Sequence, residues 1–448
     1  MTSERTTRLT RYYIGMAAFL VSLGLLLLTL VDMRRGFLFS DYFKVGSPSV
    51  LLNLDWRHLP LLLIGGLGMW LTWKYILRVE RNLGDKRMQL KTVANVLAIV
   101  IGLLLVADLF VYRGVPASRF LAAGKMGVGS GPMGLGRALP VASLPGWLQP
   151  VGDGINYLLI VWHATTLGML LGSLFLVAGA RLVARLRGKG FGSHIAATGM
   201  SLAQPFCSCC AAPIGSALYR RGASLGPVLA FTVSAPMLNI TSLALAAALL
   251  PAQFALLRIA GGVIVGVFLT YGVSLLVARW ITREETEASH GKFFEWSTKV
   301  LAAYSRLFHF ERLFSEETID SPATLISNWL GMAWRLARVL VPILLVGSIL
   351  SLYLVRAMPD TGNNVLGVGI SAFFGTLLMV PTWTEIPFAV ALINKGLTGV
   401  AASALITLPA VSLPCLLIIG GALRSLKVAL VLGLSIFVVG VVAGIIFL

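Results

Sequence analysis

The sequence predicts an all-α polytopic membrane protein, and three observations support this fold class. Of the 448 residues, 57% are hydrophobic and only 12% are charged, against about 25% charged residues in an average soluble chain. Apolar windows near the ~20 residues that cross a hydrocarbon core recur along the whole chain. Lysine and arginine gather between these windows, where they orient helices and meet anionic headgroups. The net charge of +18 therefore predicts a lipid bilayer as partner and no nucleic acid.

An N-terminal region, residues 1–150, contains three predicted spans. They cover about Tyr12–Val31, Leu59–Val79 and Thr92–Tyr112. The loop after the second span is strongly basic, which predicts that this loop and the N-terminus are cytoplasmic. No small-residue cleavage site follows the first window, so it is predicted to be an uncleaved helix. The segment 113–154 is rich in glycine and proline, and we expect it to be non-helical and external.

The rest of the chain contains an internal repeat. From Pro213 the first copy reads PIGSALYRRG, and from Pro387 the second reads PFAVALINKG. Both have Leu at the sixth place, a basic residue at the ninth and Gly at the tenth. A second proline follows in each copy, Pro236 and Pro409, after 23 and 22 residues. This pattern favours a duplication, with a first repeat at 151–281, a polar cytoplasmic loop at 282–327 and a second repeat at 328–448.

One segment of each repeat either crosses the membrane or folds back on itself. Because Arg220 and Arg221 are expected to stay in the cytoplasm, we favour re-entrant hairpins at Ala196–Tyr219 and Leu366–Asn394, entering from opposite sides. A crossing segment would instead move the polar loop outside. The hairpin alternative predicts an inverted repeat with about nine full spans plus two hairpins. Its spans after the N-terminal region cover 155–182, 225–250, 256–277, 329–355, 397–423 and 428–447.

Prolines break the predicted helices at corresponding places in the two repeats. Proline removes a backbone donor and interrupts a helix, and lipid tolerates the freed groups only where protein or a water-filled cavity surrounds them. Paired breaks in an inverted repeat are typical of the central site of a secondary transporter. The breaks lie at 204–213 and 381–387, and we expect them to meet near the middle of the bilayer.

Three cysteines occupy the first break: Cys207, Cys209 and Cys210. Thiolates are soft ligands that favour Cu(I), Zn and similar thiophilic species, and a helix N-terminus such as the one expected after Pro213 stabilises a thiolate. A non-helical stretch allows two or three sulfurs to converge, so all three are candidate substrate and metal ligands. The alternative is that they are small apolar residues, which is our interpretation of the isolated Cys415.

Further polar residues of the predicted spans are candidates for substrate binding or coupling. Glu385 is the candidate coupling residue, because a carboxylate in a span is costly and usually marks an ion or proton path; the alternative is a rim carboxylate in water. Thr384 beside it is a candidate substrate contact. Asn239 and Ser412 occupy matched repeat positions, where they either face substrate or hydrogen-bond between helices. His163 is a second coupling candidate, or else a buried histidine with a satisfied hydrogen bond.

Motifs of enzymes are not found in the sequence. It has no nucleotide-binding loop and no zinc-protease, kinase or hydrolase signature, which predicts a non-enzyme without a cofactor. Two other functions stay open. A membrane thiol oxidoreductase would use the C-x-x-C spacing from Cys207 to Cys210, although no second cysteine pair is present to accept electrons. A permease for an organic anion would bind negative charge at the half-helix N-termini.

Both breaks carry a resemblance to a known family. The run PFCSCCAAP, followed by L-x-x-R-G and APMLN, resembles the signature of the ArsP-type predicted permeases. In the second repeat, TEIP, KG and LPAVSLP resemble that family's second signature, and the match covers about 155–448. The resemblance implies a bacterial inner-membrane permease, in a family linked to efflux of trivalent organoarsenicals and to metal tolerance. It also implies substrate contacts at Cys207 and Cys209, whereas the family more often has glycine at the position of Cys210.

Together these features predict a secondary permease that exports a thiophilic substrate, driven by the proton gradient. The expected substrate is a small thiophilic ion or organometalloid, such as a trivalent organoarsenical, arsenite, copper or zinc. The expected location is the bacterial inner membrane, with several spans and a cytoplasmic N-terminus, and a homodimer is a further expectation.

Overall fold

The computed structural model is helical, and no strand occurs in the part of the chain that it describes. It describes residues 2–35, 38–39, 55–82, 87–123, 139–202, 206–284, 299, 303, 306, 319–359, 362–380, 385–423 and 425–448. Eight helices within these ranges are long and apolar enough to cross a membrane, and a bent pair, Leu225–Met237 with Ser242–Leu249, gives a ninth when it is counted as one span. The predicted class, an all-α polytopic membrane protein, is confirmed.

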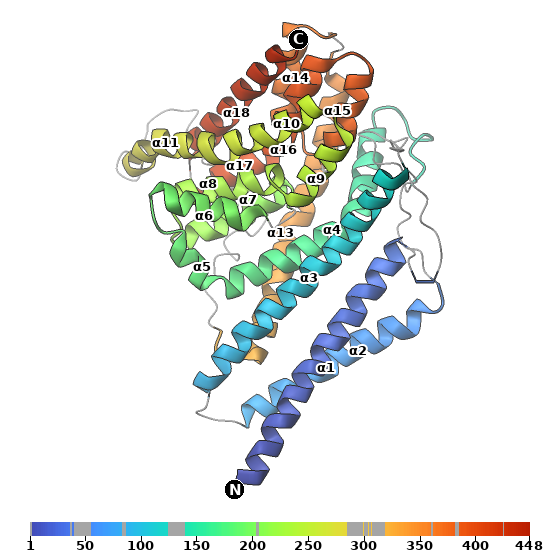
Figure 1. Ribbon diagram of the computed structural model, residues 1–448, viewed down its shortest axis with the longest axis vertical. Helices are drawn as coiled ribbons and strands as arrows, with labels where there is room; N and C mark the ends of the chain where they lie inside the picture. The colour runs from blue at the N-terminus through green and yellow to red at the C-terminus, as the bar shows by residue number, and fades with distance from the viewer. Residues whose placement is uncertain are drawn as a thin grey trace.

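The N-terminal region consists of three long helices, α1 (Thr2–Arg35), α2 (His58–Arg81) and α3 (Arg87–Ala123). Helices α1 and α2 pack along each other, and α3 packs along the next helix in the chain, α4 (Gln149–Ala178) (Figure 1). The expectation that 113–154 is non-helical was wrong at both ends. A helix that is already long adds residues at little further cost, so α3 continues through one glycine and one proline.

The two repeats consist of the same elements in the same order. Each has a first span, a hairpin of two short helices, a broken span and a last span. In the first repeat the first span is α4 with the short α5 (Ala180–Arg185), and the hairpin is α6 (Phe191–Leu202) and α7 (Ser208–Arg220). The broken span is α8 (Leu225–Met237) and α9 (Ile240–Leu249). The last span is α10 (Ala252–Val263), which continues through the π-helix η3 (Ile264–Leu269) into α11 (Thr270–Glu284). In the second repeat the first span is α13 (Pro322–Ala357), and the hairpin is α14 (Val365–Leu377) and α15 (Glu385–Asn394). The broken span is α16 (Thr398–Ala410) and α17 (Leu413–Ala422), and the last span is α18 (Leu426–Ile446).

Both hairpins return to the end at which they begin, as the re-entrant alternative predicts. After the first hairpin, Ser224 donates from its amide to the carbonyl of Leu186, at 2.8 Å, and from its hydroxyl to that of Arg187, at 2.6 Å. After the second hairpin, the amide of Gly399 donates to the side chain of Asn363, at 2.9 Å. The base of each hairpin is therefore closed by hydrogen bonds between its two ends.

The glycine at the tenth place of each repeat motif forms the turn that ends each hairpin. Gly222 has a φ of +93° and Gly396 a φ of +76°, a conformation that glycine adopts without a steric penalty. In both turns the amide after the glycine donates to a carbonyl five residues earlier, at 3.0 and 2.9 Å, which is the Schellman ending of a helix. The shared sequence motif thus produces the same local structure in the two repeats.

The first spans of the two repeats pack antiparallel. Trp329, near the start of α13, donates from its indole to the carbonyl of Leu170, late in α4, at 2.8 Å. Ser348, late in α13, lies 3.4 Å from the carbonyl of Gly154, near the start of α4. Each hairpin follows the end of its own first span, so the two hairpins enter from opposite ends of the molecule. The repeat is inverted, as predicted.

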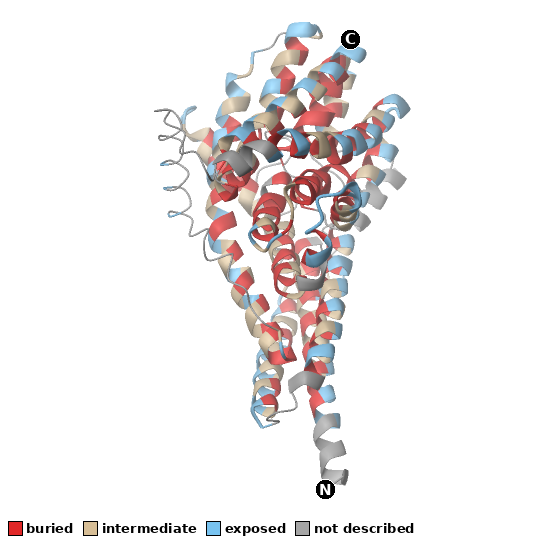
Figure 2. Cartoon of the chain, turned by 90° about the vertical axis from the view of Figure 1, so that its left-hand side faces the viewer, coloured by how far each residue is buried: buried red, intermediate tan, exposed pale blue. Residues whose placement is uncertain are grey.

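The first halves of the broken spans form the centre of the molecule. Every residue from Gly226 to Met237 in α8 and from Gly399 to Ala410 in α16 is buried, and buried residues concentrate in this interior (Figure 2). Both arms of each hairpin pack on the broken span of their own repeat. The breaks therefore lie within protein, where freed backbone groups are tolerated.

Basic segments gather at one end of the molecule. Glu80, at the end of α2, accepts the backbone amide of Ala323 in the first turn of α13, at 3.0 Å, and the hydroxyl of Tyr12, at 2.6 Å. The end of α2 thus lies at the start of α13, which is also where α4 ends and the first hairpin has its base. Arg78 and Arg81, in the last turn of α2, therefore share this end with Arg220 and Arg221.

Candidate substrate site at the broken helices

Two of the three clustered cysteines meet at the start of α7. Cys207 is the N-cap of this helix, with an extended backbone, and its carbonyl accepts the amide of Cys210, at 3.0 Å. An N-cap side chain extends toward the third residue of its helix. The sulfur atoms of Cys207 and Cys210 are accordingly 3.1 Å apart, with Cys207 half-buried and Cys210 buried.

The half-helix begins earlier than the sequence predicted. It was expected to begin after Pro213, but α7 begins at Ser208 and contains this proline. A proline inside a helix removes one hydrogen bond, here the one to the carbonyl of Cys209, and the helix continues on both sides. The cysteines therefore occupy the first turn of a helix rather than a non-helical stretch. Their position at a helix N-terminus agrees with the prediction.

Part of the predicted site lies outside the described residues. This applies to the side chain of Cys209 and to the whole of Thr384. Three cysteines, Cys207, Cys210 and Cys415, are free thiols. Among the side chains that the structure describes, no three His, Cys, Asp or Glu residues form a group able to hold a metal ion. A site of three sulfurs, with Cys209 as the third ligand, stays a prediction.

The matched polar residues Asn239 and Ser412 cap the second halves of the broken spans. Ser412 is the N-cap of α17 and accepts the amide of Cys415, at 3.4 Å. The side chain of Asn239, just before α9, accepts the amide of Ser242, at 3.3 Å. Ser412 also lies 3.1 Å from Ser208, oxygen to oxygen. We call Cys207, Ser208, Cys210 and Ser412 the first junction, since α7 and α17 meet there.

An ion pair occupies the corresponding place in the other half of the molecule. Glu385, the first residue of α15, is 1% exposed and accepts the hydroxyl of Ser242 in α9, at 3.3 Å. Arg258 of α10 is 0% exposed, and its Nη2 is 3.4 Å from Oε1 of Glu385. We call Asn239, Ser242, Arg258 and Glu385 the second junction. The burial of Glu385 excludes the alternative of a rim carboxylate in water.

Arg258 also satisfies backbone groups that the break in α8 sets free. Its guanidinium donates to the carbonyl of Met237, at 2.6 Å, and to that of Pro236, at 3.2 Å. A cation at a helix C-terminus is favourable, because the last carbonyls are unpaired and carry partial negative charge. Sequence reasoning missed Arg258, although the cost of a charge in an apolar window applies to it as it does to Glu385.

The described parts of the hairpin breaks contact the broken spans. The two hairpin breaks were expected to meet each other; residues 204–205 and 381–384 of the breaks lie outside the described residues, and among the described ones the start of α7 contacts α17 and the start of α15 contacts α9. Each hairpin break thus meets the broken span of the opposite repeat. The inverted symmetry explains this arrangement, because it makes the two contacts equivalent.

His163 lies in a buried carboxylate–histidine pair at the boundary between the N-terminal region and the first repeat. Its Nε2 is 3.2 Å from Oδ2 of Asp108 in α3, and both side chains are buried. The ring of Tyr112 packs against the imidazole, with centroids 4.5 Å apart. His163 thus has a buried hydrogen-bond partner, and its coupling role stays a prediction. Sequence reasoning did not single out Asp108, although a carboxylate inside a predicted span could have indicated it.

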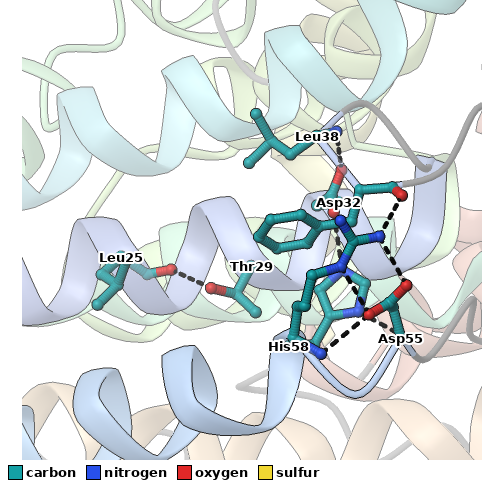
Figure 3. A network of polar contacts seen from close by, with 8 residues as sticks. Leu25, Thr29, Asp32, Leu38, Asp55 and His58 are labelled. Carbon is teal, nitrogen blue, oxygen red and sulfur yellow. Dashed lines mark hydrogen bonds and ion pairs between the residues drawn. The ribbon is translucent and has the colours of Figure 1, made fainter.

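A second buried carboxylate–histidine pair joins α1 to α2 (Figure 3). Oδ2 of Asp32 is 2.7 Å from Nε2 of His58, and Oδ1 accepts the amide of Leu38. The amide of Asp55 donates to Nδ1 of His58, at 2.9 Å, so the imidazole proton is on Nε2 and donates to Asp32. At the surface, the hydrogen bond from Arg57 lowers the pKa of Asp55. This network connects the end of α1 with the start of α2.

Antiparallel repeats that meet at broken, capped helices are typical of membrane transporters. A family model described as "Predicted permease", ArsP_1, matches residues 155–448. The chain belongs to this family, and the predicted resemblance is confirmed over the predicted range.

Curated relatives carry no assigned function in their names. The chain is 28% identical to "UPF0718 protein YraQ" of Escherichia coli over 309 residues, which is 66% of this chain and 80% of that protein. It is 26% identical to "UPF0718 protein MJ0584" of Methanocaldococcus jannaschii over 286 residues, which is 54% of this chain and 78% of that protein. No solved structure matches the chain.

Proposed function

We propose that this protein exports a small thiophilic substrate, which binds to the cysteines of the first junction. The observation that carries the proposal is the sulfur pair of Cys207 and Cys210, 3.1 Å apart at the N-terminus of α7. A helix N-terminus favours the thiolate form, which is the form that binds soft ions. Cys207 is half-buried and Cys210 is buried, so one sulfur is covered by protein and the other stays partly accessible at the break.

The sulfur pair has a spacing that suits chelation after a small adjustment. Two thiolates bound to one tetrahedral ion at ~2.3 Å are about 3.8 Å apart. Rotation of the two side chains covers the difference from 3.1 Å. Cys209, in the same turn, is the proposed third ligand for a trivalent arsenical or a soft metal ion. Thr384, Asn239 and Ser412 are the proposed lining of the path.

Proton coupling is proposed at the second junction and at His163. Glu385 is a buried carboxylate within hydrogen-bonding distance of two helices, α9 and α10, so its protonation changes the charge at a helix break. The end of the molecule that carries Arg220 and Arg221 is proposed to face the cytoplasm, because basic segments are retained there. The N-terminus is proposed to lie on the same side, and the proposed direction of transport is export across the inner membrane.

The experiment that tests this proposal measures uptake into inside-out vesicles with and without a proton gradient. Arsenite, methylarsenite, antimonite, copper and zinc are the probes. We expect Cys207→Ser and Cys210→Ser each to abolish uptake of the transported probe. Cys415→Ala is the matched control, since it removes a thiol buried in α17, and it should transport normally. Normal uptake by the Cys207→Ser/Cys210→Ser double variant would refute the thiol role.

A thiol oxidoreductase is the second candidate, because the same 3.1 Å separation suits a dithiol that forms a disulfide. The two candidates differ in what a single cysteine does. If the protein exchanges disulfides, a Cys210→Ser variant should trap a partner protein through Cys207 as a mixed disulfide. A permease gives no such adduct on a non-reducing gel and still loses uptake.

A further inference from the structure

Arg258 and Glu385 are the only ionisable residues of the helices that form the second junction. Helices α8, α9, α10, α15 and α16 contain no other acidic, basic, histidine, cysteine or tyrosine residue. Arg258 is 0% and Glu385 1% exposed. A buried guanidinium requires a negative partner, since an isolated charge in a protein interior is very costly. Glu385 is the partner that these helices supply.

The contact between the two charged groups is long. The Arg258–Glu385 contact is a single 3.4 Å approach to one carboxylate oxygen, whereas a charge-assisted pair is usually about 2.7–2.9 Å and often bidentate. The Nε–H of Arg258 is buried and has no hydrogen-bond partner among the residues described. A buried ion pair needs excellent geometry to compensate for its desolvation, and this pair does not have it.

The surroundings of the carboxylate favour negative charge in general. Glu385 is at the N-terminus of α15, and its Oε1 also accepts from Ser242 in the first turn of α9. A hydroxyl from the first turn of α9 and a guanidinium from α10 thus approach the same carboxylate oxygen, and hydrogen-bond donors and positive charge both stabilise an anion. Nothing in this arrangement requires that the anion belong to the chain.

We propose that Arg258 is the binding group of a site for a small monoanion and that Glu385 fills this site when no ligand is bound. When Glu385 is protonated, a carboxylate or an oxyanion of similar size binds to Arg258 in its place. The protein then carries one proton and one anion together, so the buried charge stays balanced. This site differs from the thiol site, and it assigns residues to the organic-anion alternative that the sequence left open.

The test uses purified full-length protein and radiolabelled acetate, whose carboxylate is the group to be replaced. Glu385→Gln mimics the protonated state and keeps its size. Near neutral pH we expect this variant to bind acetate saturably and at least about tenfold more tightly than the unmodified protein. The double variant Glu385→Gln/Arg258→Gln should show no saturable binding.

Controls separate the site from effects of folding and of net charge. Glu385→Gln/Arg258→Lys keeps the cation and should bind acetate, which covers the outcome that Arg258→Gln unfolds the protein. Glu80→Gln neutralises a different buried carboxylate and should bind acetate no better than the unmodified protein. Equal affinity in Glu385→Gln and the unmodified protein, or binding retained by a folded Arg258→Gln double variant, would overturn the proposal. Neither result bears on the cysteines, whose role is tested by uptake of thiophilic probes.

Discussion

Thr407 packs between two glycines in the second repeat, and this contact allows a sharp test of the structure. It is a buried residue of α16, with Gly375 of α14 on one side and Gly440 of α18 on the other. A Cβ at Gly440 would be 2.2 Å from the Cγ2 methyl of Thr407, and a Cβ at Gly375 would be 2.1 Å from its hydroxyl oxygen. The two glycines therefore meet different atoms of one side chain.

Gly440→Ala is expected to destabilise the protein by overpacking. An ordinary carbon–carbon contact is about 3.5–4.0 Å, so the new methyl group would be short by roughly 1.3 Å or more. The Thr407 hydroxyl donates to the carbonyl of Ser403, at 2.9 Å, and rotation of the side chain would break this bond. Overpacking of this kind costs about 1–3 kcal/mol.

Thr407→Ser removes the methyl group that clashes and keeps the hydroxyl. Alone it should cost about 1 kcal/mol for the lost methyl group. Combined with Gly440→Ala it should restore stability to within about 1 kcal/mol of the unmodified protein, because the alanine methyl fills the space that Cγ2 leaves. The same change should not rescue Gly375→Ala, since the hydroxyl that this alanine meets is still present.

The assay is equilibrium unfolding in mixed micelles, followed by tryptophan fluorescence. Gly331→Ala in α13 is the control, because its Cβ would meet no atom within 4 Å, and it should be neutral or slightly stabilising. The reasoning is refuted if Gly440→Ala is as stable as the unmodified protein, or if Thr407→Ser rescues both glycine variants equally.

Three further predictions concern the attachment of the N-terminal region, coupling and topology. Glu80→Ala leaves two buried donors without an acceptor and should cost roughly 2–5 kcal/mol in the same unfolding assay; an unchanged midpoint would contradict the contact between α2 and α13. If His163 carries the coupling proton, Asp108→Asn and His163→Gln should each reduce proton-driven uptake, and the double variant should be no worse than either; additive losses would show that the two residues act separately. Lys189 and Lys395 lie at the bases of the two hairpins, and each can be replaced by cysteine. Lys189→Cys should react with an impermeant thiol reagent only from the cytoplasm and Lys395→Cys only from outside. The reverse pattern of labelling would contradict the proposed topology.

The architecture was largely predictable from the sequence. Apolar windows predicted the presence and the order of the spans, because crossing a hydrocarbon core imposes a length and a composition on each segment. Some ends differ: α3 and α4 extend into 113–154, and α13 begins at Pro322, before the predicted 329. The repeat was visible because proline and glycine act locally: Gly222 and Gly396 end their helices at matched places whatever surrounds them. Basic segments indicated the re-entrant hairpins, and the hydrogen bonds at the hairpin bases agree.

The candidate site was predictable only in part. The cysteines, Glu385, Asn239 and Ser412 all lie at helix breaks, as their positions next to prolines indicated. Their partners were not predictable, because Arg258 is 127 residues from Glu385 along the chain and no local pattern links the two.

What the sequence by itself determined is therefore the class of protein, the order of its elements and the places where helices break, since each follows from composition or from a few neighbouring residues. Only the tertiary structure decided that α7 meets α17 and that α15 meets α9, and that a buried arginine faces the glutamate. These contacts depend on how the inverted repeats pack around α8 and α16, and packing selects partners by shape and charge across the whole fold rather than by distance along the chain.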